Sequence, residues 1–170
     1  MSYLERIANA YAEVSFSQEE LVFYARHLLL PSVGTEGQQK LKAARVLVVG
    51  AGGLGCPALQ GLAGAGVGHI SIIDGDNIEL SNLARQWLHS SKDLDCNKAE
   101  SAKRSIIRLN PYLQVESFCD MLTQANAETL IASHDLVLDA TDDMHVRYLI
   151  DAVCAKFNRP WIHAALYRNK

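Results

Sequence analysis

Short apolar runs alternate with longer amphipathic stretches from residue 45 to the end of the chain. The apolar runs are rich in Val, Ile and Leu and have the length of buried strands, whereas the stretches between them have helical spacing. The predicted strands are residues 46–50, 69–74, 113–120, 135–140 and 159–166, and the predicted helices are 53–66, 97–110, 123–134 and 143–158.

This alternation predicts an α/β protein with a doubly wound, mainly parallel sheet and helices on both faces. In such a fold a ligand binds outside the carboxyl ends of the strands. The chain has 170 residues, enough for one domain with a substantial core.

The first 44 residues have helical periodicity only. We expect residues 1–15 to form an N-terminal helical extension and residues 16–170 to form the domain. Ser17 and Glu20 have capping-box spacing at the start of a predicted helix over 17–30, which ends before Pro31, and a second short helix is expected over 34–44. One apolar face of the extension consists of Leu4, Ile7, Ala8 and Tyr11.

The composition excludes several classes of function. The net charge is −3 with no basic block, so we expect no nucleic-acid partner. No apolar run reaches the roughly 18 residues of a membrane span, and the N-terminus lacks the layout of a signal peptide. A cytoplasmic location is the expectation that follows.

The cysteines and histidines are interpreted as packing and surface residues. Neither a CxxC pair nor a disulfide framework is present, so a structural zinc site is not supported. We expect Cys119 and Cys154 to fill core space, and packing rather than reactivity for Cys56. His69 and His134 precede strands and are expected at the surface or in loops, and no histidine is assigned a catalytic role.

A glycine-rich turn follows the first predicted strand. The segment from Gly50 to Gly55 fits GxGxxG, with a strand before it, a helix after it and Asp74 at the end of the second strand. Gly50 allows a tight turn, Gly52 lets the backbone approach phosphate, and Gly55 lets the helix pack on the strand. The helix N-terminus favours phosphate and Asp74 can bind a ribose, a Rossmann-like nucleotide site. By itself the motif leaves a dinucleotide open.

Further polar residues are expected at the same edge of the sheet. Asp76, Asn82 and Arg85 follow the second strand, and Lys98 begins a helix. The stretch after the fourth strand carries Asp139, Asp142, Asp143 and Arg147. Two cations and a carboxylate that can hold Mg²⁺ suit a triphosphate and a leaving pyrophosphate better than a dinucleotide.

These motifs together resemble the ThiF/MoeB/HesA group of E1-like activating enzymes. The matching segments are "FYARH" with Arg26, "GQQKL", "VLVVGAGGLG", "AGVG", "IDGDNIELSNLARQ", "NKAESA", "LNP" and "LDATDD", in the family's order. The resemblance covers residue 16 to the end and is nearer to MoeB and ThiF than to other members.

The resemblance implies an adenylyltransferase. Such enzymes use ATP and Mg²⁺ to adenylate the C-terminal glycine carboxylate of a ubiquitin-fold protein, here a sulfur carrier like ThiS or MoaD, for thiamin or molybdopterin synthesis. Carried over by motif, the catalytic residues are Arg26, Arg85, Lys98 and Asp142, with Asp142 holding Mg²⁺ and Arg26 entering the site of a second subunit in a homodimer. The implied nucleotide-binding residues are Gly50, Gly52, Gly53, Gly55, Asp74, Asp76, Ser81, Asn82, Leu83, Ala84, Arg85, Lys98, Asp142 and Asp143.

The chain also departs from the family pattern. Asp143 stands where the family has asparagine, and His27 replaces the glutamine after Arg26. The sequence stops after the fifth strand, so we expect a domain truncated on its C-terminal side, without the family's crossover cysteine or zinc pair. This truncation leaves a non-catalytic nucleotide-binding or dimerisation module as one alternative. The GxGxxG turn with Asp74 leaves an NAD-binding oxidoreductase domain as another.

Overall fold

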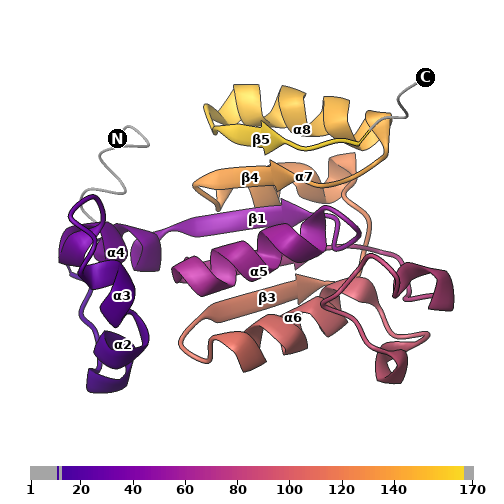
Figure 1. Cartoon of the computed structure of the whole chain (residues 1–170). Helices are drawn as coiled ribbons and strands as arrows, with labels where there is room; N and C mark the ends of the chain where they lie inside the picture. The colour runs from indigo at the N-terminus through magenta and orange to yellow at the C-terminus, as the bar shows by residue number, and fades with distance from the viewer. Residues whose placement is uncertain (1–10, 12, 167–170) are drawn as a thin grey trace.

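A five-stranded parallel sheet forms the centre of the molecule in a computed structural model that describes residues 11 and 13–166 (Figure 1). Its order is β3-β2-β1-β4-β5, and every neighbouring pair is parallel. The strands are β1 (Arg45–Val49), β2 (His69–Ile73), β3 (Gln114–Phe118), β4 (Leu136–Asp139) and β5 (Trp161–His163). Strands β2 and β3 are added on one side of β1, whereas β4 and β5 lie on its other side, so the switch point of the sheet lies between β1 and β4. The predicted α/β fold is confirmed.

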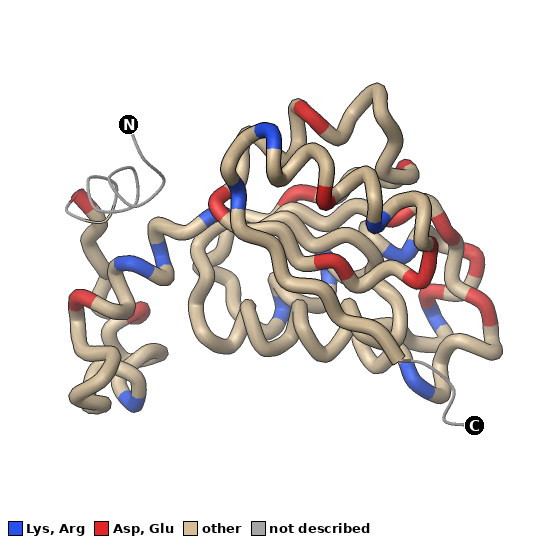
Figure 2. Tube along the Cα trace, turned by 90° about the horizontal axis from the view of Figure 1, so that it is seen from above, with Lys and Arg blue, Asp and Glu red and all other residues tan. Residues whose placement is uncertain are grey.

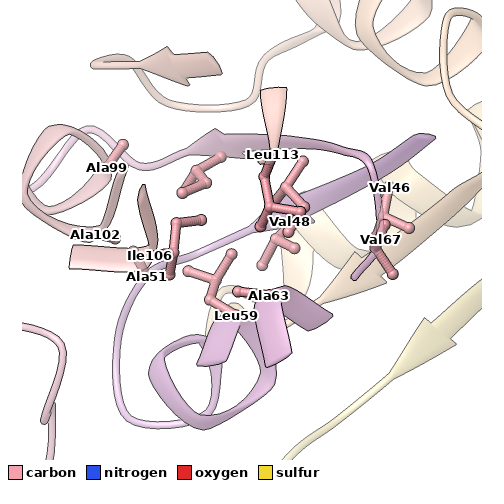
Figure 3. Close-up of a cluster of buried hydrophobic side chains, with 12 residues drawn as sticks. Val46, Val48, Ala51, Leu59, Ala63, Val67, Ala99, Ala102, Ile106 and Leu113 are labelled. Carbon is pink, nitrogen blue, oxygen red and sulfur yellow. The ribbon is translucent and has the colours of Figure 1, made fainter. Parts of the chain in front are cut away.

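Helices cover both faces of this sheet. Helices α5 (Gly55–Ala65) and α6 (Lys98–Leu109) pack on one face, and α7 (Gln124–Ala132) and α8 (Met144–Phe157) pack on the other. Val46 and Val48 of β1 join the core beneath α5 and α6 (Figure 3), whereas Leu47 and Val49 join the opposite core. A strand buried on both faces needs apolar side chains at every position, which accounts for the unbroken run in the sequence.

The N-terminal helices lie at the amino ends of the strands (Figure 1). They are α2 (Gln18–Phe23), α3 (Ala25–Leu28) and α4 (Gly34–Ala43). The Ser17–Glu20 capping box is present, but the single helix expected over 17–30 is wrong, because it is interrupted at Tyr24. Tertiary packing fixes this residue: Tyr24 is buried, and its hydroxyl accepts a hydrogen bond from Asn110 Nδ2 at 2.9 Å.

Part of the predicted N-terminal extension lies outside the described residues. Of its apolar face, only Tyr11 is described, and Leu4, Ile7 and Ala8 are not. The extension and the boundary at residue 16 therefore stay predictions. No helix within residues 11 and 13–166 is both long enough and apolar enough to cross a membrane.

The expectation for Cys119 is wrong, and that for His134 holds in part. Cys119 is exposed rather than in the core, because it follows the edge strand β3. His134 lies in the connection between α7 and β4, as the loop alternative expected, but it is buried, with Nε2 at 2.8 Å from Ser71 Oγ and Nδ1 at 2.6 Å from the Leu130 carbonyl oxygen. Hydrogen bonding at both ring nitrogens lets this polar side chain occupy the interior.

Two other cysteines are packing residues as expected. Cys154 is a buried residue of α8, and burial raises the pKa of its thiol to about 11. Cys56 is also buried, and burial raises its pKa as well. A thiol with a raised pKa carries little thiolate near neutral pH and is a poor nucleophile.

Candidate nucleotide-binding site

One large pocket opens at the carboxyl ends of β1, β2 and β4, and its volume is about 740 Å³. Figure 2 shows charged residues of both signs gathered at this end of the sheet, away from the N-terminal helices. The predicted site residues that line the pocket are Gly50, Gly52, Gly53, Asp74, Asp76, Asn82, Arg85, Lys98, Asp142 and Asp143. Those that do not line it are Arg26, Gly55, Ser81, Leu83 and Ala84.

The glycine turn has the geometry that its motif predicts. Gly50 has a φ of +94°, and a Cβ there would lie 2.9 Å from the Ala140 carbonyl oxygen. A Cβ on Gly55 would lie 2.0 Å from the carbonyl oxygen of Gly50, so this glycine serves the close packing of helix on strand. A Cβ on Gly52 would lie 3.6 Å from the side chain of Gln86, and a Cβ on Gly53 would lie 3.8 Å from that of Arg85. Because no backbone atom of the described residues covers these two glycines, their backbone is accessible to a phosphate.

Asp74 shapes the edge of the pocket from the end of β2. Its Oδ2 accepts a hydrogen bond from the Ala51 backbone N–H at 2.7 Å, and its Oδ1 accepts one from Asp76 at 2.9 Å. An ionised carboxylate offers about four acceptor positions, so capacity remains for ribose hydroxyls. Asp74 thus ties the glycine turn to the loop after β2 while it faces the pocket.

Lys98 is a preformed cation in the pocket wall. It is the first residue of α6, its side chain is only 11% exposed, and its Nζ lies 2.7 Å from Asp76 Oδ2. Asn97 caps this helix by accepting from Ala99 and Glu100, which fixes the backbone from which the lysine projects. Lys98 is therefore held in place without a ligand.

A short loop after β2 carries the second cation. Arg85 is exposed, its Nη1 donates to the Ser81 carbonyl oxygen at 3.1 Å, and its side chain lies over Gly53. Asn82 is buried, and its Oδ1 accepts from Glu79 N at 3.1 Å. Leu83 contributes backbone to this turn, with its N–H donating to Leu80. Asn82 thus shapes the loop, while Arg85 keeps its Nε and Nη2 without a hydrogen-bond partner among the described residues and can offer them to a phosphate.

The carboxylates after β4 separate into different roles. Asp139 is fully buried in an ion pair with Arg147, so it is not available to a ligand. Asp143 is the N-cap of α8, because its Oδ1 accepts from the His145 backbone N–H at 2.7 Å. The carboxylate that replaces the family's asparagine therefore serves a helix terminus, a role that asparagine also fills well.

Asp142 fits the requirements of a magnesium ligand. It is exposed, lines the pocket, and makes no side-chain hydrogen bond or ion pair within residues 11 and 13–166. In that same part of the chain, no cluster of three or more His, Cys, Asp or Glu could hold a metal ion. Mg²⁺ commonly binds through one or two carboxylates together with substrate phosphates and waters. An accessible carboxylate beside a phosphate-sized cradle is consistent with that mode.

Sequence reasoning missed Gln86 and His89. Gln86 lines the pocket, is 4% exposed, and has an Oε1 that finds no hydrogen-bond partner among the described residues. Behind the turn, His89 donates from Nε2 to the Ala51 carbonyl oxygen at 3.0 Å, with Nδ1 at 3.0 Å from Ser101 Oγ. Because Gln86 directly follows the predicted site residue Arg85, its place near the pocket could have been predicted, whereas no pattern in the sequence marked His89.

The pKa of His89 predicts an acid-sensitive fold. Burial lowers the pKa of the His89 ring, and burial with nearby Arg45 lowers that of His69. Because both rings take up protons more readily in the unfolded chain, we expect the free energy of unfolding to fall as the pH drops below about 6.5. The thermal unfolding midpoint, measured between pH 5 and 8, checks this.

A His89→Gln variant provides the control, because an amide can keep one hydrogen bond without titrating. Its unfolding midpoint should fall less steeply below pH 6.5 than that of the wild type. Equal slopes in the two proteins would contradict the assignment to His89.

The chain belongs to the ThiF family, whose model matches residues 24–170. It is 44% identical over 154 residues to the probable adenylyltransferase/sulfurtransferase MoeZ of Mycobacterium tuberculosis, and the match covers 91% of this chain and 39% of that protein. It is 42% identical to the probable molybdopterin-synthase adenylyltransferase of Porphyra purpurea, covering 91% of this chain and 40% of that protein. The chain therefore spans about two fifths of the length of these relatives.

Solved structures share the same fold. The E. coli tRNA N6-threonylcarbamoyladenosine dehydratase TcdA, in complex with ATP, is 27% identical with a TM-score of 0.83, covering 88% of this chain and 61% of that chain. E. coli MccB with AMPCPP and MccA is 29% identical with a TM-score of 0.74, covering 92% and 46%. The resemblance noted in the sequence is thus confirmed at the level of family and fold.

Proposed function

We propose that this chain carries the adenylation site for the C-terminal glycine carboxylate of a ubiquitin-fold sulfur carrier of the ThiS or MoaD kind. ATP is the co-substrate and pyrophosphate is released. The observation that carries the proposal is the gathering of Arg85, Lys98 and Asp142 around one accessible glycine turn. A dinucleotide would use the turn and Asp74 but would leave these residues without a role. The relatives named as adenylyltransferases support the same reaction class.

The chemistry requires charge neutralisation rather than proton transfer. A carboxylate oxygen of the carrier attacks the α-phosphorus, a new P–O bond forms, and the bond to the β-phosphate bridging oxygen breaks, so that pyrophosphate leaves with the electron pair. The carrier carboxylate is already ionised near neutral pH, so no general base is needed. Backbone N–H groups at Gly52 and Gly53, with Arg85 and Lys98, screen the phosphates and align the reacting groups.

Asp142 is the residue that would hold Mg²⁺ beside the phosphates. The cation would neutralise phosphate charge that Arg85 and Lys98 leave uncompensated. Asp143 retains one carboxylate oxygen outside its helix cap, and Asp76 is left with an unpaired charge whenever Lys98 turns to a phosphate. Both are assigned to the periphery of the nucleotide site.

Arg26 is assigned to the pocket of a second copy in a homodimer. It is exposed on α3 and does not line the pocket of its own chain. The helix α3 packs on α4, which leads into the amino end of β1, whereas the pocket lies at the carboxyl ends of the strands (Figure 1). An arginine at the far end of the sheet can serve this chemistry only in trans. In this proposal, residues 16–170 form the ATP-binding domain.

ATP–pyrophosphate exchange tests the proposal. With a ThiS-like or MoaD-like carrier, we expect exchange that depends on Mg²⁺ and disappears when the terminal glycine of the carrier is removed. Because the chain is a fraction of the length of its relatives, the thermal shift with nucleotide is measured in parallel. MgATP should raise the unfolding midpoint, and NAD should not, because binding to the folded state stabilises it.

The outcomes separate the alternatives. Stabilisation by NAD and not by ATP would overturn the proposal in favour of a dinucleotide domain. Stabilisation by ATP without exchange, in the presence of carriers of both kinds, would favour a non-catalytic binding module.

A further inference from the structure

A fully buried aspartate lies directly behind the nucleotide pocket. Asp139 ends β4 with an exposure of 0%, and its Oδ2 lies 3.2 Å from Arg147 Nε and 2.9 Å from His163 Nδ1. Burying such an ion pair is seldom more stabilising than apolar packing would be, so its presence suggests a requirement for specific geometry. The proposed adenylation uses none of these side chains directly.

The ion pair holds both backbone polar groups of one loop residue. The Thr141 N–H donates to Asp139 Oδ1 at 3.0 Å, and Arg147 Nη2 donates to the Thr141 carbonyl oxygen at 3.2 Å. On the other side of the loop, the Asp143 N–H donates to Thr141 Oγ1 at 3.1 Å. The backbone is therefore anchored on both sides of Asp142.

Asp142 itself depends on this backbone for its position. Its carboxylate has no side-chain partner among the described residues, although it faces the pocket. Arg147 also lines the pocket, but its Nε and Nη2 bind Asp139 and Thr141, and its Nη1 contacts Met144 Sδ. With all three nitrogens engaged within the protein, Arg147 is suited to hold the loop rather than to bind a ligand.

We propose that Asp139 and Arg147 are positioning residues that fix the Thr141 peptide and, through it, place the Asp142 carboxylate for the divalent cation that accompanies ATP. This inference rests on the adenylation function proposed above. A misplacement of about 1 Å can cost on the order of 10²-fold in such a site, so a rigid loop matters. His163 acts as a second brace on Asp139 from β5.

Arg147→Lys is the informative variant. Lysine keeps a positive charge for the buried Asp139, but its ammonium lacks the planar fork that holds Asp139 and the Thr141 carbonyl at once. Calorimetry gives the ATP affinity with Mg²⁺ and with EDTA, and the ratio of the two is the metal gain. We expect the metal gain to fall about tenfold, with the affinity in EDTA unchanged. Arg108→Lys, on the exposed side of α6, is the matched control and should leave the ratio unchanged.

A double-mutant cycle shows whether Arg147 acts through Asp142. Asp142→Ala should abolish the metal gain, and adding Arg147→Lys to it should change nothing more, because the route is already removed. Asp139→Asn, which keeps the acceptor for Thr141 N, should reduce the metal gain in the same direction. If Asp139→Asn lowers the metal gain as Arg147→Lys does, and the unfolding midpoint without ligand is unchanged, misfolding of Arg147→Lys is excluded as the cause.

Three results would overturn the inference. The first is a metal gain in Arg147→Lys and Asp139→Asn equal to that of the wild type. The second is a loss of ATP affinity in EDTA in these variants, which would indicate direct contact with ATP. The third is additive effects of Arg147→Lys and Asp142→Ala in the double-mutant cycle. If the wild type itself shows no ATP binding, the proposed function falls together with the inference. If the wild type binds MgATP and the variants match it, the positioning role alone falls.

Discussion

Lys98→Ala is expected to reduce ATP–pyrophosphate exchange by about 10²–10³-fold, the usual cost of removing one preorganised charge-stabilising group. Lys98 is held in the pocket wall by Asp76, so its charge already lies in the pocket before the phosphates arrive. Folding should be little affected, because the Asp76 side chain left behind is 61% exposed and remains hydrated. Lys156→Ala, which breaks an exposed pair with Glu128, is the matched control.

Mixing Arg26→Ala with Lys98→Ala tests whether each active site contains residues from both subunits. If Arg26 acts in trans, Arg26→Ala alone should lose ATP–pyrophosphate exchange activity, as Lys98→Ala does. In a mixture, half the dimers are heterodimers, and each contains one site with both native residues. Because one of the two sites in such a dimer is intact, roughly a quarter of the wild-type activity should return, as closed two-fold symmetry requires.

Failure of this complementation has a definite meaning. No recovery after subunit exchange, confirmed by mass measurement of heterodimers, would place Arg26 in its own pocket or outside the chemistry. Full activity of Arg26→Ala alone would remove it from the site. If Lys98→Ala lost no more exchange activity than Lys156→Ala, Lys98 would likewise have no role in the site.

Gly55→Ala is expected to destabilise the fold and abolish ATP binding together. A Cβ at this position would lie 2.0 Å from the Gly50 carbonyl oxygen, which belongs to the backbone and cannot move aside cheaply. Overpacking of this kind costs about 1–3 kcal/mol, or about 2–4 °C in the unfolding midpoint for each kcal/mol in a domain of this size. The turn would have to shift, and the cradle at Gly52 and Gly53 would shift with it.

Gly61→Ala in the same helix should have the opposite effect. Gly61 is exposed, and a Cβ there would meet nothing within 4 Å. Alanine in a helix interior is favoured over glycine by about 0.5–1 kcal/mol, so the unfolding midpoint should rise and ATP binding should persist. Thermal unfolding of both variants, with and without MgATP, checks the pair. Equal shifts in the two variants would contradict the packing role of Gly55.

The order of strands and helices was predictable because local patterns carry it. The apolar run at β1 and the glycine turn after it follow from burial on two faces and from backbone geometry, both of which leave signatures in neighbouring residues. The helix over 17–30 was not predictable as drawn, because its interruption at Tyr24 depends on contacts with Asn110, distant in sequence.

Around the pocket, the sequence identified the types of residue but not their roles. Asp139, Asp142 and Asp143 are the same residue type. In the structure, however, Asp139 is buried in an ion pair, Asp142 is accessible in the pocket, and Asp143 caps α8. Gln86 and His89 had no pattern to mark them, because their burial and partners come from elements that meet only in the folded chain.

The sequence by itself determined the family, the alternation of strands and helices, and the nucleotide turn with its nearby charges, because each of these resides in contiguous segments. Only the tertiary structure decided that Asp139 and Arg147 face each other behind the pocket and that His89 supports Ala51. It also placed α3, the helix that carries Arg26, at the end of the sheet opposite the pocket (Figure 1). The physical reason is that burial and distance between remote segments are set by packing, and packing has no local signature in the chain.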